Sequence, residues 1–328
     1  MKLLIVLYHR FELWNAPDWL APRLKTEFPQ LEITHLRRYE GVEEALHDAE
    51  IAIAWSLRPE QFKAAANLRW IHAPAAAVHQ LLFPELIQSE VLLTNAREVH
   101  GPVVAEHVIA QIFALAKKIP QAVNLQHKKI WGQELLWREK PPPREVMGSN
   151  LGLIGLGSIG REVAQRAAAL SMHVLAVREH PGKGTAAGVH QVYGPDNLDL
   201  LLSRSDYVVL AAPVTPTTRV LINAERLHTI KAGSYLINVS RGPLVDEDAL
   251  ISALKEGKLA GAALDVFSKE PLSPESPLWE MENVLITPHS AAITEKLWER
   301  HYALIAENLR RYLAHRPLLS LVDKRAGY

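Results

Sequence analysis

Three segments in the second half of the chain place a chemically capable side chain directly after an apolar run. Arg241 lies in INVSRGPLVDEDAL, Glu270 in LDVFSKEPL and His289 in LITPHSAA. A guanidinium is a planar fork of donors suited to a carboxylate, and an imidazole transfers protons near neutral pH. A carboxylate beside that imidazole orients it and favours its protonated form. Ligands of open α/β sheets bind outside the carboxyl ends of the strands. The three segments therefore predict a reactive site at such ends.

The segment LGLIGLGSIG, residues 151 to 160, has the glycine spacing of a dinucleotide-binding turn. Gly155, Gly157 and Gly160 form the G-x-G-x-x-G pattern between an apolar strand and a helix predicted over Ile159 to Leu170. The first glycine allows a tight turn, the second lets the backbone approach a pyrophosphate, and the third lets the helix pack on the strand. The helix N-terminus then attracts the phosphates.

The acidic residue expected about twenty positions after this motif is missing. The next strand, HVLAV, ends in Arg178, 18 positions after Gly160 (178 − 160). A carboxylate would accept hydrogen bonds from the ribose 2′-OH of NAD, whereas a guanidinium can bind the 2′-phosphate of NADP. Lys183 adds a second cation, while the adjacent Glu179 leaves an NAD contact open, as does an Arg178 that points to solvent. We predict a preference for NADP over NAD.

Composition limits the classes of function. The chain has 328 residues, enough for two domains, with a formal net charge of +0 and no cysteine. This balance gives no support for nucleic-acid or anionic-membrane binding, and we predict no metal site, no disulfide and no cysteine nucleophile. The N-terminal MKLLIVLYHR favours a buried strand over a signal peptide. No apolar run approaches membrane-spanning length, so the cytoplasm is the expected location.

Short apolar runs alternate with helix-length segments, as in parallel α/β sheets. Most of these runs are apolar at successive positions, which is typical of strands buried on both faces. The first series of predicted strands is 3–7, 31–36, 51–55, 69–73 and 91–95, with helices over 42–48 and 59–66. The second series is 151–155, 173–177, 207–212, 235–239, 261–266 and 284–288. The prediction is an α/β protein with two doubly wound parallel-sheet domains.

Three further segments shape the organisation. A nearly apolar helix is predicted over Gly101 to Lys118, and a polar excursion with Trp131 and Trp137 over residues 124 to 150. A last helix over residues 294 to 314 has an apolar stripe. We expect that helix to cross back to the first domain, which would make the first domain discontinuous.

With these segments in order, the chain resembles the D-isomer-specific 2-hydroxyacid dehydrogenase family. The resemblance rests on GLGSIG, on the run from AAPVTPTTRV to SRGPLVDEDAL, on GAALDVFSKEPL and on NVLITPHSAA, with VAEHVIA at 104–110. It implies a substrate-binding domain over 1–99 plus 293–328 and an NAD(P)-binding domain over 100–292, with substrate in the cleft between them. It also implies a homodimer.

The resemblance implies that Arg241, Glu270 and His289 are catalytic. Reduction of a 2-keto acid builds negative charge on the ketone oxygen, so a proton must arrive with the hydride of NAD(P)H. Arg241 would hold the substrate carboxylate and carbonyl, His289 would donate the proton, and Glu270 would orient His289. The product would be a D-2-hydroxy acid.

The remaining implied contacts lie around these residues. The expected cofactor contacts are Gly155, Gly157, Ser158, Ile159, Gly160, Arg178, Lys183, Pro213, Val239, Ser240, Asp265 and Ala291, with Asp265 at the nicotinamide carboxamide. The expected substrate contacts are Ala75, Ala76, Ala77, Leu57 and Arg241, with Trp55 also near the cleft. The family's usual glycine in the first-domain loop is replaced here by alanine. Trp131 and Trp137 resemble aromatics that reach a partner subunit's site, although packing at a dimer interface or under a loop explains them as well.

Two alternatives stay open. A phosphite-type dehydrogenase keeps the same three catalytic residue types, whereas formate dehydrogenases use Gln where this chain has Glu270. A dinucleotide-sensing corepressor would bind the cofactor without turnover. The sequence also leaves open which 2-keto acid is used and the physiological direction.

Overall fold

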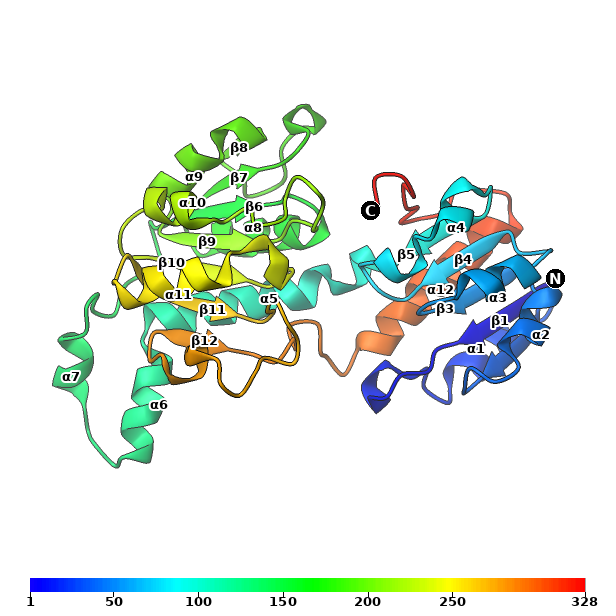
Figure 1. The fold of residues 1–328 in the computed structure, drawn as a ribbon, viewed down its shortest axis with the longest axis horizontal. Coiled ribbons are helices and arrows are strands. Elements are labelled where there is room, and N and C mark those ends of the chain that lie inside the picture. Colours follow the sequence, from blue (N-terminus) through cyan, green and yellow to red (C-terminus); the bar gives the residue numbers. More distant parts are fainter. Residues whose placement is uncertain (328) are drawn as a thin grey trace. The chain divides into compact units, whose positions relative to one another are not determined.

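The computed structural model describes residues 1–327, apart from the side chain of Lys183. The chain divides into two compact units, the first formed by Met1–His100 with Thr294–Tyr328 and the second by Gly101–Ile293. The first unit is therefore discontinuous in sequence. Figure 1 shows the two parallel sheets and the helices packed on each.

The first unit is built on a five-stranded sheet of order β2-β1-β3-β4-β5 in which every neighbouring pair is parallel. Its strands are β1 (Lys2–Val6), β2 (Glu32–Leu36), β3 (Ile51–Ala54), β4 (Trp70–Ala73) and β5 (Leu92–Asn95). Its helices are α1 (Leu20–Glu27), α2 (Val42–His47), α3 (Pro59–Ala64), α4 (Pro84–Gln88) and α12 (Leu297–Leu313), with 3-10 turns η1 (Glu12–Trp14) and η2 (His79–Leu81).

Alternate residues of β1 enter different apolar clusters, because successive side chains of a strand point to opposite faces. Leu3 and Ile5 pack with α1 and α12. Leu4 and Val6 pack with α2 and α4. The apolar stripe of α12 therefore completes the core of the first unit from the far end of the sequence (Figure 1).

The second unit has a seven-stranded parallel sheet of order β12-β11-β10-β9-β6-β7-β8. Its strands are β6 (Asn150–Ile154), β7 (His173–Val177), β8 (Gln191–Tyr193), β9 (Tyr207–Leu210), β10 (Ser234–Asn238), β11 (Leu259–Leu264) and β12 (Val284–Ile286). The predicted fold class, two doubly wound parallel sheets, is confirmed.

Helices cover both faces of this second sheet. One face packs against α5 (Arg97–Ala116) and α8 (Ser158–Ala169). The other packs against α9 (Leu198–Arg204), α10 (Ala224–Thr229) and α11 (Glu247–Lys255). The remaining elements are α6 (Ile119–His127), α7 (Gln133–Trp137) and the 3-10 turns η3 (Pro181–Lys183), η4 (Pro195–Asn197), η5 (Gly242–Leu244) and η6 (Pro277–Glu280).

Two details differ from the sequence prediction. Helix α5 begins at Arg97 rather than Gly101 and runs through Pro102, which costs one backbone hydrogen bond. Strand β8 was not predicted, since its three residues are half-buried or exposed at a sheet edge and give only a weak apolar signal.

Helix α5 is long and apolar enough to cross a membrane by length and composition, contrary to the expectation that no segment reaches that length. Val108 and Ile112 are fully buried in the core of the second unit, together with Val104 and Leu115. This packing is that of the core helix of a globular unit, in which an apolar helix is buried against a sheet.

Candidate active site

The order of the second sheet locates its ligand-binding edge. The chain moves outward from β6 to β7 and β8, then returns to place β9 on the other side of β6. In doubly wound sheets the ligand binds at the carboxyl ends of the strands where the direction reverses. Gly155 follows β6 and residues 211 to 213 follow β9, so the glycine motif lies at this switch point.

The three glycines match the steric demands of a dinucleotide. Gly155 has a φ of +101°, and a Cβ there would lie 2.7 Å from the backbone of Ala211. A Cβ on Gly160 would lie 2.2 Å from the carbonyl oxygen of Gly155, so only glycine lets α8 pack this closely. A Cβ on Gly157 would meet no described atom within 4 Å. Gly157 caps the N-terminus of α8, and the backbone there is open to a pyrophosphate, as the motif requires.

Arg178 lies immediately after β7, on the side of the site where a ribose would bind. Its Nη1 donates to the carbonyl oxygen of Gly184 at 3.4 Å, and its backbone N–H donates to Tyr193 at 3.1 Å. The side chain is half-buried. The side chain of Lys183, predicted to act with it, lies outside the described residues.

His289 and Glu270 form a hydrogen-bonded pair. His289 Nδ1 lies 2.7 Å from Glu270 Oε2, and the two side chains are 48% and 35% exposed. The other carboxylate oxygen, Oε1, accepts the backbone N–H of Phe267 at 3.0 Å. The carboxylate is thus fixed at both ends, and the Nε2 atom of His289 is left for a reactant.

The charge on Glu270 is maintained by its neighbours. Burial raises the pKa of Glu270, but hydrogen bonds from His289 and the Phe267 N–H, together with the charge of Arg241, outweigh it. The pKa of Glu270 therefore lies below its ordinary value. Burial lowers the pKa of Arg241 while Glu270 opposes that change. The three predicted catalytic residues are thus electrostatically coupled within one unit.

Arg241 follows β10 and precedes η5. Its Nη1 donates to the carbonyl oxygen of Ser240 at 2.6 Å, and its own carbonyl accepts from Asn238 Nδ2 at 3.0 Å. Asp246, which could have paired with Arg241, instead caps α11 by accepting the N–H of Ala249 at 3.1 Å.

Asp265 directly follows β11 and is 1% exposed. Its Oδ1 accepts from Thr287 Oγ1 at 2.6 Å and from the Ser290 N–H at 2.9 Å, and its Oδ2 accepts the Ala291 N–H at 3.1 Å. Its carbonyl oxygen accepts the His289 N–H at 2.8 Å. Asp265 therefore holds the loop that carries His289, whatever it offers to a cofactor.

The other predicted cofactor contacts lie along the same edge. Pro213 follows β9, Val239 and Ser240 follow β10, and Ser240 Oγ donates to the carbonyl of Ala212. Ala291 is 4% exposed beside the core. Ser158 is the first residue of α8, and Ile159 is partly buried beside the core.

The predicted substrate loop of the first unit lies between β4 and η2. Ala75 and Ala76 direct carbonyl oxygens inward, where they accept from the Ala96 N–H at 2.9 Å and from Asn95 Nδ2 at 2.8 Å. Ala77 is half-buried beside them. Leu57 is 4% exposed and packs in the apolar core. Its side chain therefore serves packing, which the sequence pattern did not reveal.

Two aromatic side chains of the excursion are unusually exposed. Trp131 is 95% exposed and Trp137, at the end of α7, is 70% exposed. Helices α6 and α7 project from the body of the second unit (Figure 1). Side chains this accessible are not packed under a loop of the same chain.

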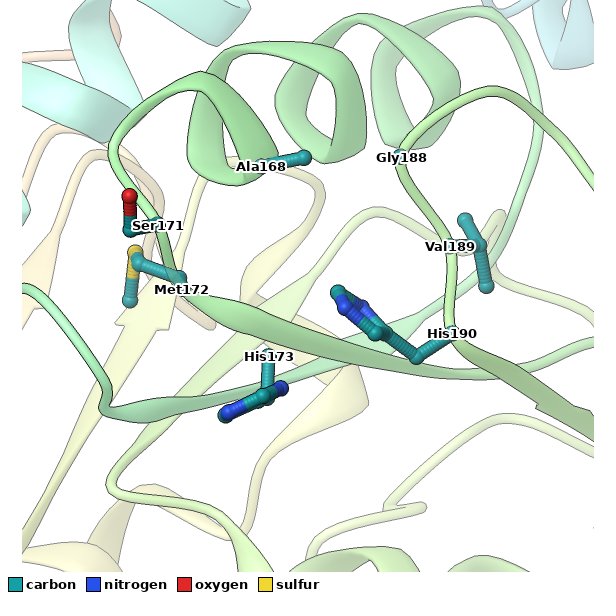
Figure 2. Close-up of a pocket in the computed structure, with 7 residues that line it drawn as sticks. All are labelled: Ala168, Ser171, Met172, His173, Gly188, Val189 and His190. Atoms are coloured by element: carbon teal, nitrogen blue, oxygen red, sulfur yellow. The ribbon is translucent and has the colours of Figure 1, made fainter.

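A cavity of about 550 Å³ lies at the amino-terminal ends of β7 and β8 (Figure 2). It is lined by Ala168, Ser171, Met172, His173, Gly188, Val189 and His190, none of which is a predicted site residue. His190 Nδ1 accepts the N–H of Val174 at 3.1 Å, so the neutral ring carries its proton on Nε2 and offers no lone pair to a metal. This cavity is at the opposite end of the strands from the glycine motif.

Sequence reasoning missed a polar group beside the His289 loop. His107 Nε2 lies 3.1 Å from Thr287 Oγ1 and 3.1 Å from Gln111 Nε2. His107 and Gln111 are one helical turn apart on α5, a spacing that places them on one face. That polar spacing in an otherwise apolar helix was the available signal, and Thr287 precedes His289 in the same segment.

Comparison with known proteins places these features in context. The family model described as D-isomer specific 2-hydroxyacid dehydrogenase, NAD binding domain, matches residues 109–291, more than half of the chain. The chain is 36% identical over 269 residues to a glyoxylate reductase from Thermofilum pendens, covering 81% of this chain and 78% of that protein. It spans only 46% to 55% of the length of three D-3-phosphoglycerate dehydrogenases that it matches.

Two solved structures share the complete architecture. A D-isomer specific 2-hydroxyacid dehydrogenase from Xanthobacter autotrophicus, in complex with NADPH and MES, is 31% identical with a TM-score of 0.81 over 100% of this chain and 99% of that one. An NADPH-dependent glyoxylate/hydroxypyruvate reductase from Sinorhizobium meliloti, in complex with NADP and sulfate, is 28% identical with a TM-score of 0.83 over 100% of both chains.

Proposed function

We propose that this chain, which belongs to the D-isomer-specific 2-hydroxyacid dehydrogenase family, reduces a small 2-keto acid to the D-2-hydroxy acid, with His289 as the proton donor. Family membership makes it an NAD(P)-dependent oxidoreductase of 2-hydroxy and 2-keto acids. The substrate, the direction and the residue roles are the proposal.

One observation carries the residue roles. His289 Nδ1 faces the Glu270 carboxylate at 2.7 Å, at the same strand ends as the dinucleotide-binding glycines. The chain has 15 histidines, so residue type alone does not identify a catalytic one. A histidine with an anionic partner on one nitrogen and an accessible second nitrogen has the arrangement that general acid–base catalysis needs.

The residues divide the chemistry as follows. Arg241 binds the substrate carboxylate and carbonyl through its fork of donors. His289 gives the Nε2 proton to the carbonyl oxygen as negative charge develops there, and Glu270 stabilises the imidazolium before that transfer. The bound nicotinamide supplies the hydride. In the reverse direction, His289 Nε2 accepts the hydroxyl proton.

Several residues would hold the cofactor. The backbone from Gly157 to Gly160, at the start of α8, would bind the pyrophosphate. Pro213, Val239, Ser240 and Ala291 would line the nicotinamide side. The Oδ2 atom of Asp265 accepts one backbone N–H and keeps acceptor capacity for a carboxamide N–H.

We propose NADP(H) as the preferred cofactor. Arg178 stands at the end of β7, where a carboxylate would select the 2′-OH of NAD. A guanidinium there forms charge-assisted bonds with a 2′-phosphate instead. Lys183 is proposed as a second cation. The relatives from Xanthobacter and Sinorhizobium, each solved with NADPH or NADP, agree with this choice.

We propose glyoxylate and hydroxypyruvate as the first substrates to test, since similar proteins bear the name glyoxylate reductase or glyoxylate/hydroxypyruvate reductase. The domain expected over 1–99 with 293–328, which nearly coincides with the first unit, is proposed to bind substrate through the backbone of Ala75 to Ala77. The second, 100–292, is proposed to bind the cofactor.

We further propose a cytoplasmic homodimer that covers Trp131 and Trp137. These side chains are 95% and 70% exposed in the single chain, a large apolar area to leave in water. Light scattering on a size-exclusion column should give twice the 36.6 kDa chain mass. Trp131→Ser together with Trp137→Ser should shift the enzyme toward the monomer. An unchanged mass would contradict the proposal that the dimer covers these two side chains.

Initial rates of NADPH and NADH oxidation on a panel of 2-keto acids test the activity. We expect turnover with at least one small 2-keto acid and faster turnover with NADPH. Parallel assays with phosphite and formate, in the oxidising direction, separate the related chemistries. Cofactor binding without turnover of any of these substrates would contradict the proposed catalytic activity and would favour a dinucleotide-sensing protein.

A further inference from the structure

A partly buried polar group links α5 to the loop that carries His289. His107 and Gln111 lie on α5, Thr287 follows β12, and Asp265 follows β11. Thr287 Oγ1 contacts three of these partners: it donates to Asp265 Oδ1 at 2.6 Å and lies 3.1 Å from His107 Nε2 and 3.4 Å from Gln111 Nε2. All four residues belong to the second unit.

The hydroxyl of Thr287 sets the direction of these bonds. A hydroxyl has one proton and two lone pairs. Asp265 is acceptor-only when ionised, so the Thr287 proton goes to its carboxylate, and the Thr287 oxygen must accept from α5. His107 Nε2–H and the Gln111 amide are the donors within reach. The buried and unpartnered Oε1 of Gln111 favours turning that amide over, which makes the atom nearest His107 an acceptor. The single Nε2–H of His107 is then the donor, shared between Gln111 and Thr287.

His107 is suited to this neutral donor role. It is 22% exposed, and its Nε2 lies 3.8 Å from Asp265 Oδ1. Burial lowers the pKa of His107, and the charge of Asp265 opposes that effect only in part. A neutral ring with its proton on Nε2 donates to Thr287 without placing a second charge beside the carboxylate.

The far side of Asp265 fixes the backbone that carries His289. The carboxylate accepts the N–H groups of Ser290 and Ala291, and the Asp265 carbonyl accepts the N–H of His289. His289 itself has a φ of +51°, a left-handed conformation that is unfavourable for a residue with a side chain. Such a conformation persists only where the surroundings over-determine it, and these three bonds provide that restraint.

We propose that Thr287 and His107 are positioning residues, forming a hydrogen-bonded relay from α5 through Asp265 that fixes the His289 backbone and so aims its ring at the reactant. Thr287 and His107 act through Asp265, and neither of these two residues is proposed to touch substrate or cofactor. Its effect on turnover rests on the proposed function, whereas its effect on the loop does not.

Thr287→Val removes the hydroxyl and keeps the branched shape. We expect kcat to fall about 10- to 100-fold, as misplacement of a catalytic group does, with KM and the NADPH dissociation constant changed much less. Hydrogen exchange followed by mass spectrometry should show faster exchange in the peptide spanning residues 288–292. Thr287→Ser keeps the hydroxyl and should recover most of kcat and the slow exchange. Thr229→Val, on the exposed surface of α10, is the matched control.

The His107 end of the relay has its own variant. His107→Leu should lower kcat less than Thr287→Val, because the bond from the Thr287 hydroxyl to Asp265 remains in that variant. The double variant should lose little beyond Thr287→Val alone, since two residues that act through one bond are not additive. His228→Leu, an exposed histidine on α10, controls for loss of an imidazole.

The outcomes separate the relay from the activity. Unchanged kcat and unchanged exchange in Thr287→Val would overturn the relay, and so would a Thr287→Ser enzyme as impaired as Thr287→Val. Fully additive losses in the double variant would remove His107 from it. If the unaltered enzyme reduces no 2-keto acid, the proposed function fails, but faster exchange in residues 288–292 of Thr287→Val would still support the relay.

Discussion

His289 in the second unit and His301 in the first show how differently two parallel-sheet units use an imidazole. His289 is 48% exposed and has Glu270 on one nitrogen. His301, on α12, is fully buried, and neither ring nitrogen has a hydrogen-bond partner among the residues described. Its ring centroid lies 5.5 Å from that of His100. An imidazole becomes useful for proton transfer through its partner and its access to a reactant, and residue type alone does not supply either.

The electrostatic consequences run in opposite directions. Burial lowers the pKa of His72, in β4, to about 3 and holds the pKa of His301 well below its ordinary value. In the second unit, hydrogen bonds from His289 and Phe267 and the charge of Arg241 keep Glu270 ionised against the effect of its partial burial. Burial keeps these histidines of the first unit uncharged, whereas the second unit holds charged side chains at the ends of its strands.

Removal of the imidazole at the strand ends should have the largest effect on turnover. His289→Ala should cut kcat by roughly 10²- to 10⁴-fold, because no other side chain replaces the proton donor. Its NADPH affinity and unfolding midpoint should stay near those of the unaltered enzyme. His228→Ala, on the exposed surface of α10, should keep normal kcat. Near-normal turnover in His289→Ala would show that His289 is not the proton donor and does not differ in function from a buried histidine such as His301.

Removal of the carboxylate partner should have the next largest effect. Glu270→Gln keeps the shape and loses the charge that stabilises the imidazolium, so kcat should fall about 10- to 100-fold. The lowered pKa of Glu270 means that its stabilising contribution is present above its ordinary pKa and is lost only as the pH falls through the lowered value. The acid limb of the rate profile above pH ~4.5 should therefore not report Glu270. A variant with the kcat of the unaltered enzyme would remove Glu270 from the mechanism.

A substitution at the proposed cofactor site of the second unit should have a smaller effect, on the preference for NADPH over NADH. Arg178→Asp should lower the ratio of kcat/KM for NADPH to that for NADH by about tenfold or more, equivalent to loss of one charge-assisted hydrogen bond. Arg204 is an exposed arginine at the C-terminal end of α9, at the opposite end of the strands, and Arg204→Asp changes the net charge equally. The control should leave the ratio unchanged. An unchanged ratio in Arg178→Asp would contradict phosphate recognition by this residue.

The first unit should respond to acid through stability rather than turnover. The unfolded chain protonates its histidines below pH ~6.5, whereas His72 stays neutral in the folded state until about pH 3. The unfolded state therefore binds more protons in this window, and stability falls as the pH falls. One such histidine contributes up to about 1.4 kcal/mol for each pH unit.

His301→Leu removes one of these buried histidines and tests that expectation. Urea unfolding followed by tryptophan fluorescence between pH 7.5 and 5 should show a smaller decline in midpoint for the variant. His228→Leu should keep the decline of the unaltered enzyme. The same decline in both variants would show that the buried histidines of the first unit do not govern its acid sensitivity.

Much of this arrangement could be predicted from local sequence. Apolar runs predicted every strand except β8, whose three residues are exposed or half-buried and give too little apolar signal. The glycine spacing predicted the turn at Gly155 because the steric demands lie within the motif itself. The start of α5 was misplaced because Pro102 is a helix breaker by propensity, and tertiary packing overrides that preference.

The remaining features depend on contacts between distant residues. His107 and Thr287 are separated by 180 positions and meet only because α5 packs on the sheet next to the end of β12. Leu57 is apolar and follows a strand, which suits a ligand contact and a core position equally, and the structure places its side chain in the core. Hydrophobic periodicity reports which face is buried, but it does not report which polar side chains share that burial.

The chirality of the product tests the central claim most directly. Hydroxypyruvate and NADPH should be incubated with the unaltered enzyme, and the glycerate formed should be separated by chiral chromatography. The proposal predicts D-glycerate, formed in equal amount to the NADPH consumed and formed roughly 10²- to 10⁴-fold more slowly by His289→Ala. Formation of L-glycerate, or equal glycerate formation by His289→Ala, would contradict it.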